Sequence, residues 1–130
     1  MMQKFDLYDY LDASGKNDFK DWTTSLQKGQ RGKLNAKIDT LAMNGDGLMP
    51  HMLTDTPTPG IKKLRVHGNV QLRPLLCKGP INIHQEYTFL LGAIEVGSKF
   101  EPKLSDRTAE KRKQDILKNP KQRCNHERVT

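Results

Sequence analysis

The stretch from residue 61 to residue 77, IKKLRVHGNVQLRPLLC, constrains the fold more than any other part of the chain. Apolar and polar side chains alternate on both sides of His67-Gly68-Asn69, which predicts a hairpin of two antiparallel strands. A slip of one residue would move every side chain to the opposite face. A two-residue loop at Gly68-Asn69 would mix apolar and charged side chains on both faces. We therefore predict a three-residue loop, with Asn69 in the left-handed position that such a loop requires.

A three-residue loop predicts two apolar pairs on one face and two polar pairs on the other. These pairs are Val66 with Val70, Leu64 with Leu72, Arg65 with Gln71 and Lys63 with Arg73. Like charges directly opposite one another destabilise a hairpin. The pair formed by Lys63 and Arg73 therefore predicts that something anionic sits on the basic face.

Positive charge is concentrated in the second half of the chain. Residues 1–60 carry a net charge of −1, residues 61–98 carry +3 and residues 99–130 carry +5. This distribution is typical of a protein whose second half faces a polyanion such as a nucleic acid. The alternative, that a basic C-terminal segment only keeps the protein soluble, stays open.

Length and composition exclude several classes of protein. The 130 residues are enough for one domain and too few for two ordinary ones. No apolar run approaches the roughly 20 residues that cross a bilayer, and the first 19 residues lack the apolar core of a signal peptide. Cys77 and Cys124 do not make a disulfide framework, and Cys124 with His126 lacks the spacing of a four-ligand zinc site. We expect a reduced, cytoplasmic protein with no membrane segment.

The hydrophobic pattern predicts the order strand, two helices, three strands and a final helix. The expected elements are a strand over residues 5–11, a helix capped by Asn17, a second helix ending near Asn44-Gly45, a loop over residues 46–60, the hairpin, a central strand over residues 87–96, and a charged helix from Pro102 or Ser105 to about Lys118. Pro74 predicts a bulge or an edge position in the second hairpin strand.

Several short motifs appear in this order. They are the step Leu64-Arg65, a short hairpin, LRPLL around Arg73, the apolar strand FLLGAIEV, and a helix opened by Pro102 that carries AEKRKQDI. Together they resemble the RelE/ParE superfamily of bacterial toxins, in its HigB-like and phage-derived branch, over residues 5–118. The resemblance implies an α+β fold in which an N-terminal helical hairpin packs on a small, mainly antiparallel sheet and a C-terminal helix follows. It divides the chain into a toxin domain, residues 1–118, and a basic C-terminal tail, residues 119–130.

The same resemblance implies a function. The family's HigB-like members are toxins of type II toxin–antitoxin systems that cleave messenger RNA in the ribosomal A site and so inhibit translation. The implied partners are a helix-turn-helix antitoxin and the mRNA on the ribosome, and no cofactor or metal is implied. Two alternatives remain: a ParE-like inhibitor of DNA gyrase, and a non-catalytic, phage-derived module that binds nucleic acid or a partner through Lys118 to Arg128.

RNA cleavage without a metal needs a base near the 2′-hydroxyl, positive charge at the phosphorane and an acid for the 5′-oxygen. The resemblance matches the family's basic active-face positions to four catalytic candidates: Lys63, Arg65, Arg73 and Lys99. Within it, Arg73 would stabilise transition-state charge, Arg65 would position phosphate and Lys63 would act in proton transfer or electrostatically. The predicted RNA-binding residues are Lys62, His67, Gln71 and Lys103. The simpler alternative is an ordinary solvated strand face.

The chain departs from the family pattern at two places. HigB-like relatives often carry two lysines just after the central strand, where this chain has Val96-Gly97. Other nucleases of the superfamily place a catalytic tyrosine or histidine near the C-terminal segment, where this chain has Phe100, Ser105 and Asp106. The sequence therefore offers no obvious acid, which is the main support for the gyrase alternative.

Overall fold

A computed structural model describes residues 4–130 as a seven-stranded mixed sheet with three α-helices. The elements of the first half are β1 (Asp6–Tyr10), α1 (Asp18–Ser25), α2 (Lys28–Asn44), the 3₁₀ helix η1 (Gly45–Leu48), β2 (Leu53–Asp55) and β3 (Lys62–Leu64). Those of the second half are β4 (Gln71–Lys78), β5 (Glu86–Val96), β6 (Lys99–Glu101), α3 (Ser105–Lys118) and β7 (Arg123–Asn125). The predicted α+β class is confirmed. Within these residues no helix is long and apolar enough to cross a membrane.

The strands lie in the order β2-β3-β4-β5-β1-β7, and β6 pairs with β5 beside this path. Only β1 and β5 run parallel; the other strand pairs described are antiparallel. The apolar run predicted to form the central strand is β5, which lies between β4 and β1. The bulge expected near Pro74 occurs one residue later, where the register with β5 shifts between Leu75 and Leu76.

Local signals explain where the helices begin and end. The Asn17 side chain accepts a hydrogen bond from the backbone N–H of Lys20 (2.9 Å), which confirms the predicted cap of α1. Gln27 and Gln30 form a capping box at the start of α2, so this helix begins earlier than its apolar stripe suggests. Helix α3 ends at Lys118, as predicted, just before Asn119-Pro120.

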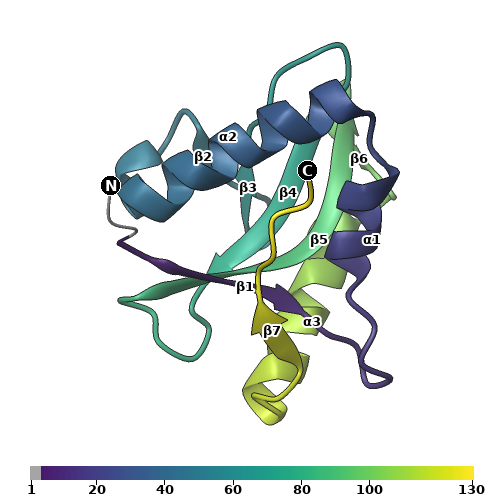
Figure 1. Cartoon of the computed structure of the whole chain (residues 1–130). Coiled ribbons are helices and arrows are strands. Elements are labelled where there is room, and N and C mark those ends of the chain that lie inside the picture. The colour runs from purple at the N-terminus through teal and green to yellow at the C-terminus, as the bar shows by residue number, and fades with distance from the viewer. Residues whose placement is uncertain (1–3) are drawn as a thin grey trace.

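Two cores lie on opposite faces of the sheet (Figure 1). The larger one, between the sheet and helices α1 and α2, consists of Phe19, Leu34, Ile38, Leu41, Leu53, Leu64, Val66, Leu72, Leu76, Tyr87 and Phe89. The smaller one, between the sheet and α3, consists of Tyr10, Ile61, Leu75, Cys77, Leu90, Leu91, Ala93, Ala109 and Ile116. Burial raises the pKa of the Cys77 thiol to about 12, as expected for a cysteine that acts as a small core residue.

The hairpin has a longer loop than predicted. Lys63 pairs with Leu75 and Val66 forms a bridge with Leu72, so five residues, 67–71, form the loop. The predicted pairs are therefore wrong by two residues, and this register places Arg65 opposite Arg73. The shift lets Leu72 replace the half-exposed Val70 as the buried partner of Val66. Because the shift is an even number, every side chain still points to the predicted face.

Three short strands, β2, β6 and β7, were not predicted. Two of them, β2 and β7, change the organisation expected from the sequence. The segment 46–60 is not only a loop, because it contains most of η1 and all of β2. The basic C-terminal tail predicted over residues 119–130 contains a strand of the sheet: β7 pairs with β1, and the N–H of His126 donates to the carbonyl of Leu7 (2.9 Å). Strands of three residues contain too few alternating positions to be recognised from a pattern.

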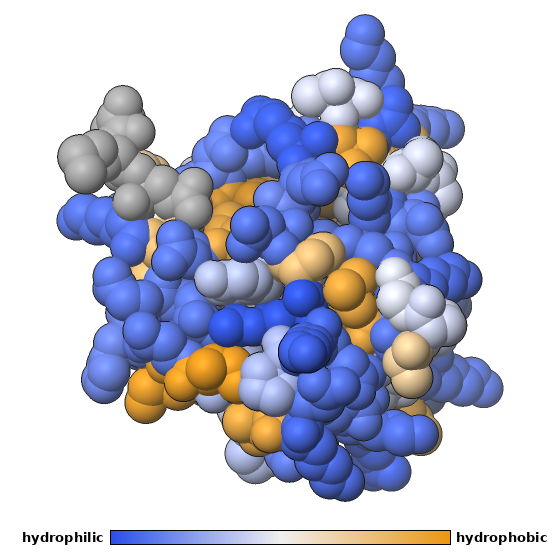
Figure 2. Space-filling model, turned by 60° about the horizontal axis from the view of Figure 1, so that its bottom comes forward, coloured by the Kyte–Doolittle hydropathy of each residue, from blue (hydrophilic) through white to orange (hydrophobic). Residues whose placement is uncertain are grey.

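Figure 2 shows a mainly hydrophilic face on which apolar residues form several separate areas. The large apolar side chains that are exposed on the described part of the molecule are Met52, Val70, Ile81, Ile83, Val96, Leu104 and Leu117. They come from different loops and element ends, which is ordinary for a protein surface.

Candidate functional site

A hollow of about 700 Å³ opens on the α3 side of the sheet, where β3, the β5–β6 turn and the start of α3 meet. Its charged lining consists of Lys63, Lys99, Lys103, Glu95 and Asp106. Its apolar lining consists of Pro57, Phe100 and Leu104. Three of the eight residues predicted as site residues therefore come together around one hollow: Lys63, Lys99 and Lys103.

Glu95 pairs with two cationic side chains. Its carboxylate accepts hydrogen bonds from Lys63 Nζ (2.9 Å) and from Arg73 Nε (2.7 Å). Burial on its own raises the pKa of Glu95, but the hydrogen bonds from Lys63 and Arg73 outweigh burial and hold the pKa below its usual value. The anionic group expected on the basic face is thus supplied by the chain itself.

Arg73 is held behind this carboxylate. Its side chain is 4% exposed, and it also donates to the carbonyl of Leu72 (2.9 Å) and to the side-chain oxygen of Gln71 (3.3 Å). It does not line the hollow. A phosphate group could reach the Arg73 guanidinium only if Glu95 moved aside.

One aromatic side chain, Phe100, lines the hollow. The ring of Phe100, on β6, is half-buried, and Lys63 Nζ lies 5.5 Å from its centroid, within the range of a cation–π contact. Lys99 and Lys103 are exposed, and they flank Phe100 in the sequence. An aromatic ring beside exposed lysines suits a nucleotide in a single strand, because the base can stack while the lysines attract the phosphates.

Four predicted residues lie elsewhere. Lys62 points to the other face and pairs with Asp55 (2.8 Å), since neighbouring residues of a strand face opposite ways. The His67 ring contacts Gln71 (3.1 Å), whose amide donates to the carbonyl of Gly68 (2.8 Å) within the hairpin loop. Arg65 is half-buried, and its Nε has no hydrogen-bond partner among the described residues.

Glu95 and Phe100 were not among the residues predicted for the site. Glu95 is the only charged residue between Thr88 and Gly97 in the apolar central strand. Its pairing opposite Gln71 puts it on the same face as Arg73. A lone carboxylate in such a strand is a usable signal, because an unpaired buried charge is costly and implies a cationic partner.

Comparison of the chain with models of known families, with curated proteins and with solved structures finds no match. Among residues 4–130, no group of three histidine, cysteine, aspartate or glutamate side chains is placed so that it could hold a metal ion.

Proposed function

We propose that the chain is the toxin component of a type II toxin–antitoxin system and cleaves mRNA on the ribosome as a metal-independent endoribonuclease. One observation carries the proposal: three lysines, an aromatic ring and an ionised carboxylate line a single open hollow. The order of motifs that resembles the HigB-like toxins supports the same activity.

The hollow offers a group for each step of cleavage by the 2′-hydroxyl. A base of the RNA stacks on Phe100, and Lys99 and Lys103 hold the flanking phosphates. The Glu95 carboxylate accepts the proton of the 2′-hydroxyl as its oxygen attacks phosphorus. Lys63, which has three N–H donors, keeps one on Glu95 and directs another to the charged phosphorane. The bond from phosphorus to the 5′-oxygen breaks, and the ammonium of Lys99 supplies the proton that this oxygen needs.

An antitoxin would compete for the same lysines. In the proposed system this partner is a helix-turn-helix protein, and it covers these lysines with acidic side chains. Lys99 and Lys103 would form its main ionic contacts, because they are exposed and no ion pair is described for either.

Primer extension on a reporter mRNA in a translating extract tests the proposal. We expect discrete cleavages with the wild-type protein, at least a tenfold loss with Lys99→Ala, and no change with Lys111→Ala, a matched exposed lysine on α3. Intact mRNA with the wild type, alongside inhibition of purified DNA gyrase, would select the ParE-like alternative.

A non-catalytic nucleic-acid module is the second candidate, and the position of Arg73 favours it. The Arg73 guanidinium is engaged by Glu95 and does not line the hollow, so the hollow can attract RNA through its lysines without strong stabilisation of a transition state. Glu95→Gln separates the two functions. For an enzyme it abolishes cleavage while RNA binding stays equal or tightens. For a binding module, neither the wild type nor Glu95→Gln cleaves, and Lys99→Ala weakens RNA binding and lowers its salt dependence.

A further inference from the structure

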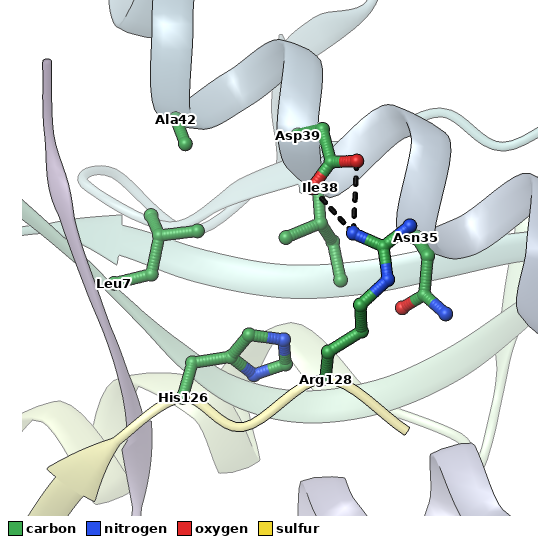
Figure 3. Close-up of a pocket in the computed structure, with 7 residues that line it drawn as sticks. All are labelled: Leu7, Asn35, Ile38, Asp39, Ala42, His126 and Arg128. Carbon is green, nitrogen blue, oxygen red and sulfur yellow. Dashed lines mark hydrogen bonds and ion pairs between the residues drawn. The ribbon is translucent and has the colours of Figure 1, made fainter. Parts of the chain in front are cut away.

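A second pocket, of about 230 Å³, lies on the opposite face of the sheet from the hollow. Figure 3 shows it between α2, β1 and the segment that follows β7. Leu7, Ile38 and Ala42 form an apolar wall. None of its residues takes part in the proposed cleavage of RNA, so its polar groups need a separate explanation.

His126 is held in one orientation by a buried carboxylate. Its Nδ1 lies 2.9 Å from Asp9 Oδ1, and the other oxygen of Asp9 accepts a hydrogen bond from the Asn17 amide (3.0 Å). The side chains of Asp9 and His126 are only 1% and 9% exposed. Because a carboxylate accepts hydrogen bonds, Nδ1 carries a proton, and in the uncharged tautomer Nε2 is an acceptor. Figure 3 shows the ring turned into the pocket.

Two further acceptors belong to α2. Asn35 is 5% exposed, and its amide nitrogen donates to the carbonyl of Val129 (2.9 Å), which leaves its side-chain oxygen for the pocket (Figure 3). At the rim, both oxygens of Asp39 accept from Nη1 of Arg128 (2.9 Å each). These two side chains are more than half exposed, so the rim can open at little cost.

We propose that this pocket binds a guanidinium or amidinium group. The imidazole Nε2, the Asn35 oxygen and the Asp39 carboxylate are three acceptors, and the rest of the lining consists of the apolar wall and Arg128. A planar group with several N–H donors and a delocalised positive charge complements this lining. The guanidinium of Arg128 already occupies the rim position on Asp39, so an incoming guanidinium replaces one contact of the same kind.

The test is an NMR titration of the full chain, labelled with ¹⁵N at histidine, with methylguanidinium chloride at constant ionic strength. We expect a saturable shift of His126 Nε2 in the millimolar range, which is ordinary for a ligand this small. Tetramethylammonium, a cation without N–H donors, should give no saturable shift. Arg128→Ala, which frees Asp39, should bind at least tenfold more tightly. A capped arginine peptide tests whether the group can come from a partner protein instead of a free small molecule.

A matched pair of variants on α2 makes the result specific. Asn35→Leu removes the buried acceptor and should weaken binding at least tenfold, whereas Asn44→Leu, the same change at an exposed position of the same helix, should leave it unchanged. Ala42→Leu, which fills the pocket, provides a second loss of binding if Asn35→Leu folds poorly. A linear response, an equal response to tetramethylammonium, or wild-type binding by a folded Asn35→Leu or Ala42→Leu would overturn the proposal.

Discussion

Helices α1 and α2 together cover one face of the sheet, whereas α3 alone covers only part of the other (Figure 1). On the first face the Asp9 carboxylate is closed off from solvent by His126, Asn17 and the aromatic core. On the second face the Glu95 carboxylate is paired with two cations and borders an open hollow. The chain thus places its largest apolar side chains where two helices can bury them, and leaves exposed lysines where one helix falls short.

The largest effect should distinguish two phenylalanines on opposite faces. Phe19 is 1% exposed and stacks on Phe89 at 4.7 Å, so Phe19→Ala should lower the free energy of unfolding by about 3–5 kcal/mol. Phe100→Ala removes a half-buried ring and should cost about 1 kcal/mol or less, because little apolar area returns to water. Urea unfolding at neutral pH measures both. Equal losses would mean that the two faces are equally important for stability.

The next effect concerns Glu95 and depends on pH. Its pKa in the folded protein lies below the usual 4.5, so its contribution is fully present at neutral pH and is lost as the pH falls through the folded pKa. Glu95→Gln should cost about 1.5–3 kcal/mol at pH 7, the range for hydrogen bonds to charged groups. The difference from wild type should shrink at pH 3. Glu101→Gln, at an exposed position on β6, is the control and should show neither effect.

Substitutions at two glycines, Gly92 and Gly32, should change the stability by amounts similar to or smaller than that of Glu95→Gln. A methyl group at Gly92, in β5, would overlap the indole ring of Trp22, so Gly92→Ala should destabilise by about 1–3 kcal/mol. Gly32, in α2, has nothing near the position of an added Cβ, and Gly32→Ala should stabilise by about 0.5–1 kcal/mol. Thermal unfolding of both variants measures the difference. A neutral Gly92→Ala would show that α1 can shift away from the sheet.

The smallest effect should come from the rim of the second pocket. Arg128 and Asp39 form an exposed ion pair, and such pairs contribute about 0–1 kcal/mol. Arg128→Ala should therefore leave the midpoint of urea unfolding nearly unchanged. A loss of several kcal/mol would mean that Arg128 fixes the last residues to α2, and that the rim does not open freely.

Much of the fold could be predicted because its signals are local. The Asn17 cap, the apolar stripe of α2, the end of α3 before Pro120 and the apolar run of β5 each depend on residues within a few positions of one another. The prediction of which side chains share a face of the hairpin was also correct, because the apolar residues of one face leave only the alternate positions for charged residues. Its register was not, because hydrophobic alternation repeats every two residues and cannot distinguish a three-residue loop from a five-residue one.

The site was harder to predict because its contacts are distant in the sequence. Lys63 and Glu95 are 32 residues apart, and Arg73 and Glu95 are 22 apart. The basic pattern of the hairpin indicated that an anion was needed but not that the chain supplied it. The second pocket was missed for the same reason: Asp9 and His126 are 117 residues apart and meet only because β7 returns to β1.

The position of β1 between β5 and β7 has a consequence for synthesis of the chain. The first strand made pairs on one side with residues 86–89 and on the other with residues 123–125. On the ribosome its two edges stay unpaired until residues 86–89 and 123–125 have been made, so formation of the sheet around β1 is delayed. Until then, other chains can pair with the exposed edges of β1. The edges of β1 are therefore protected from such pairing only once residues 123–125 have joined the sheet.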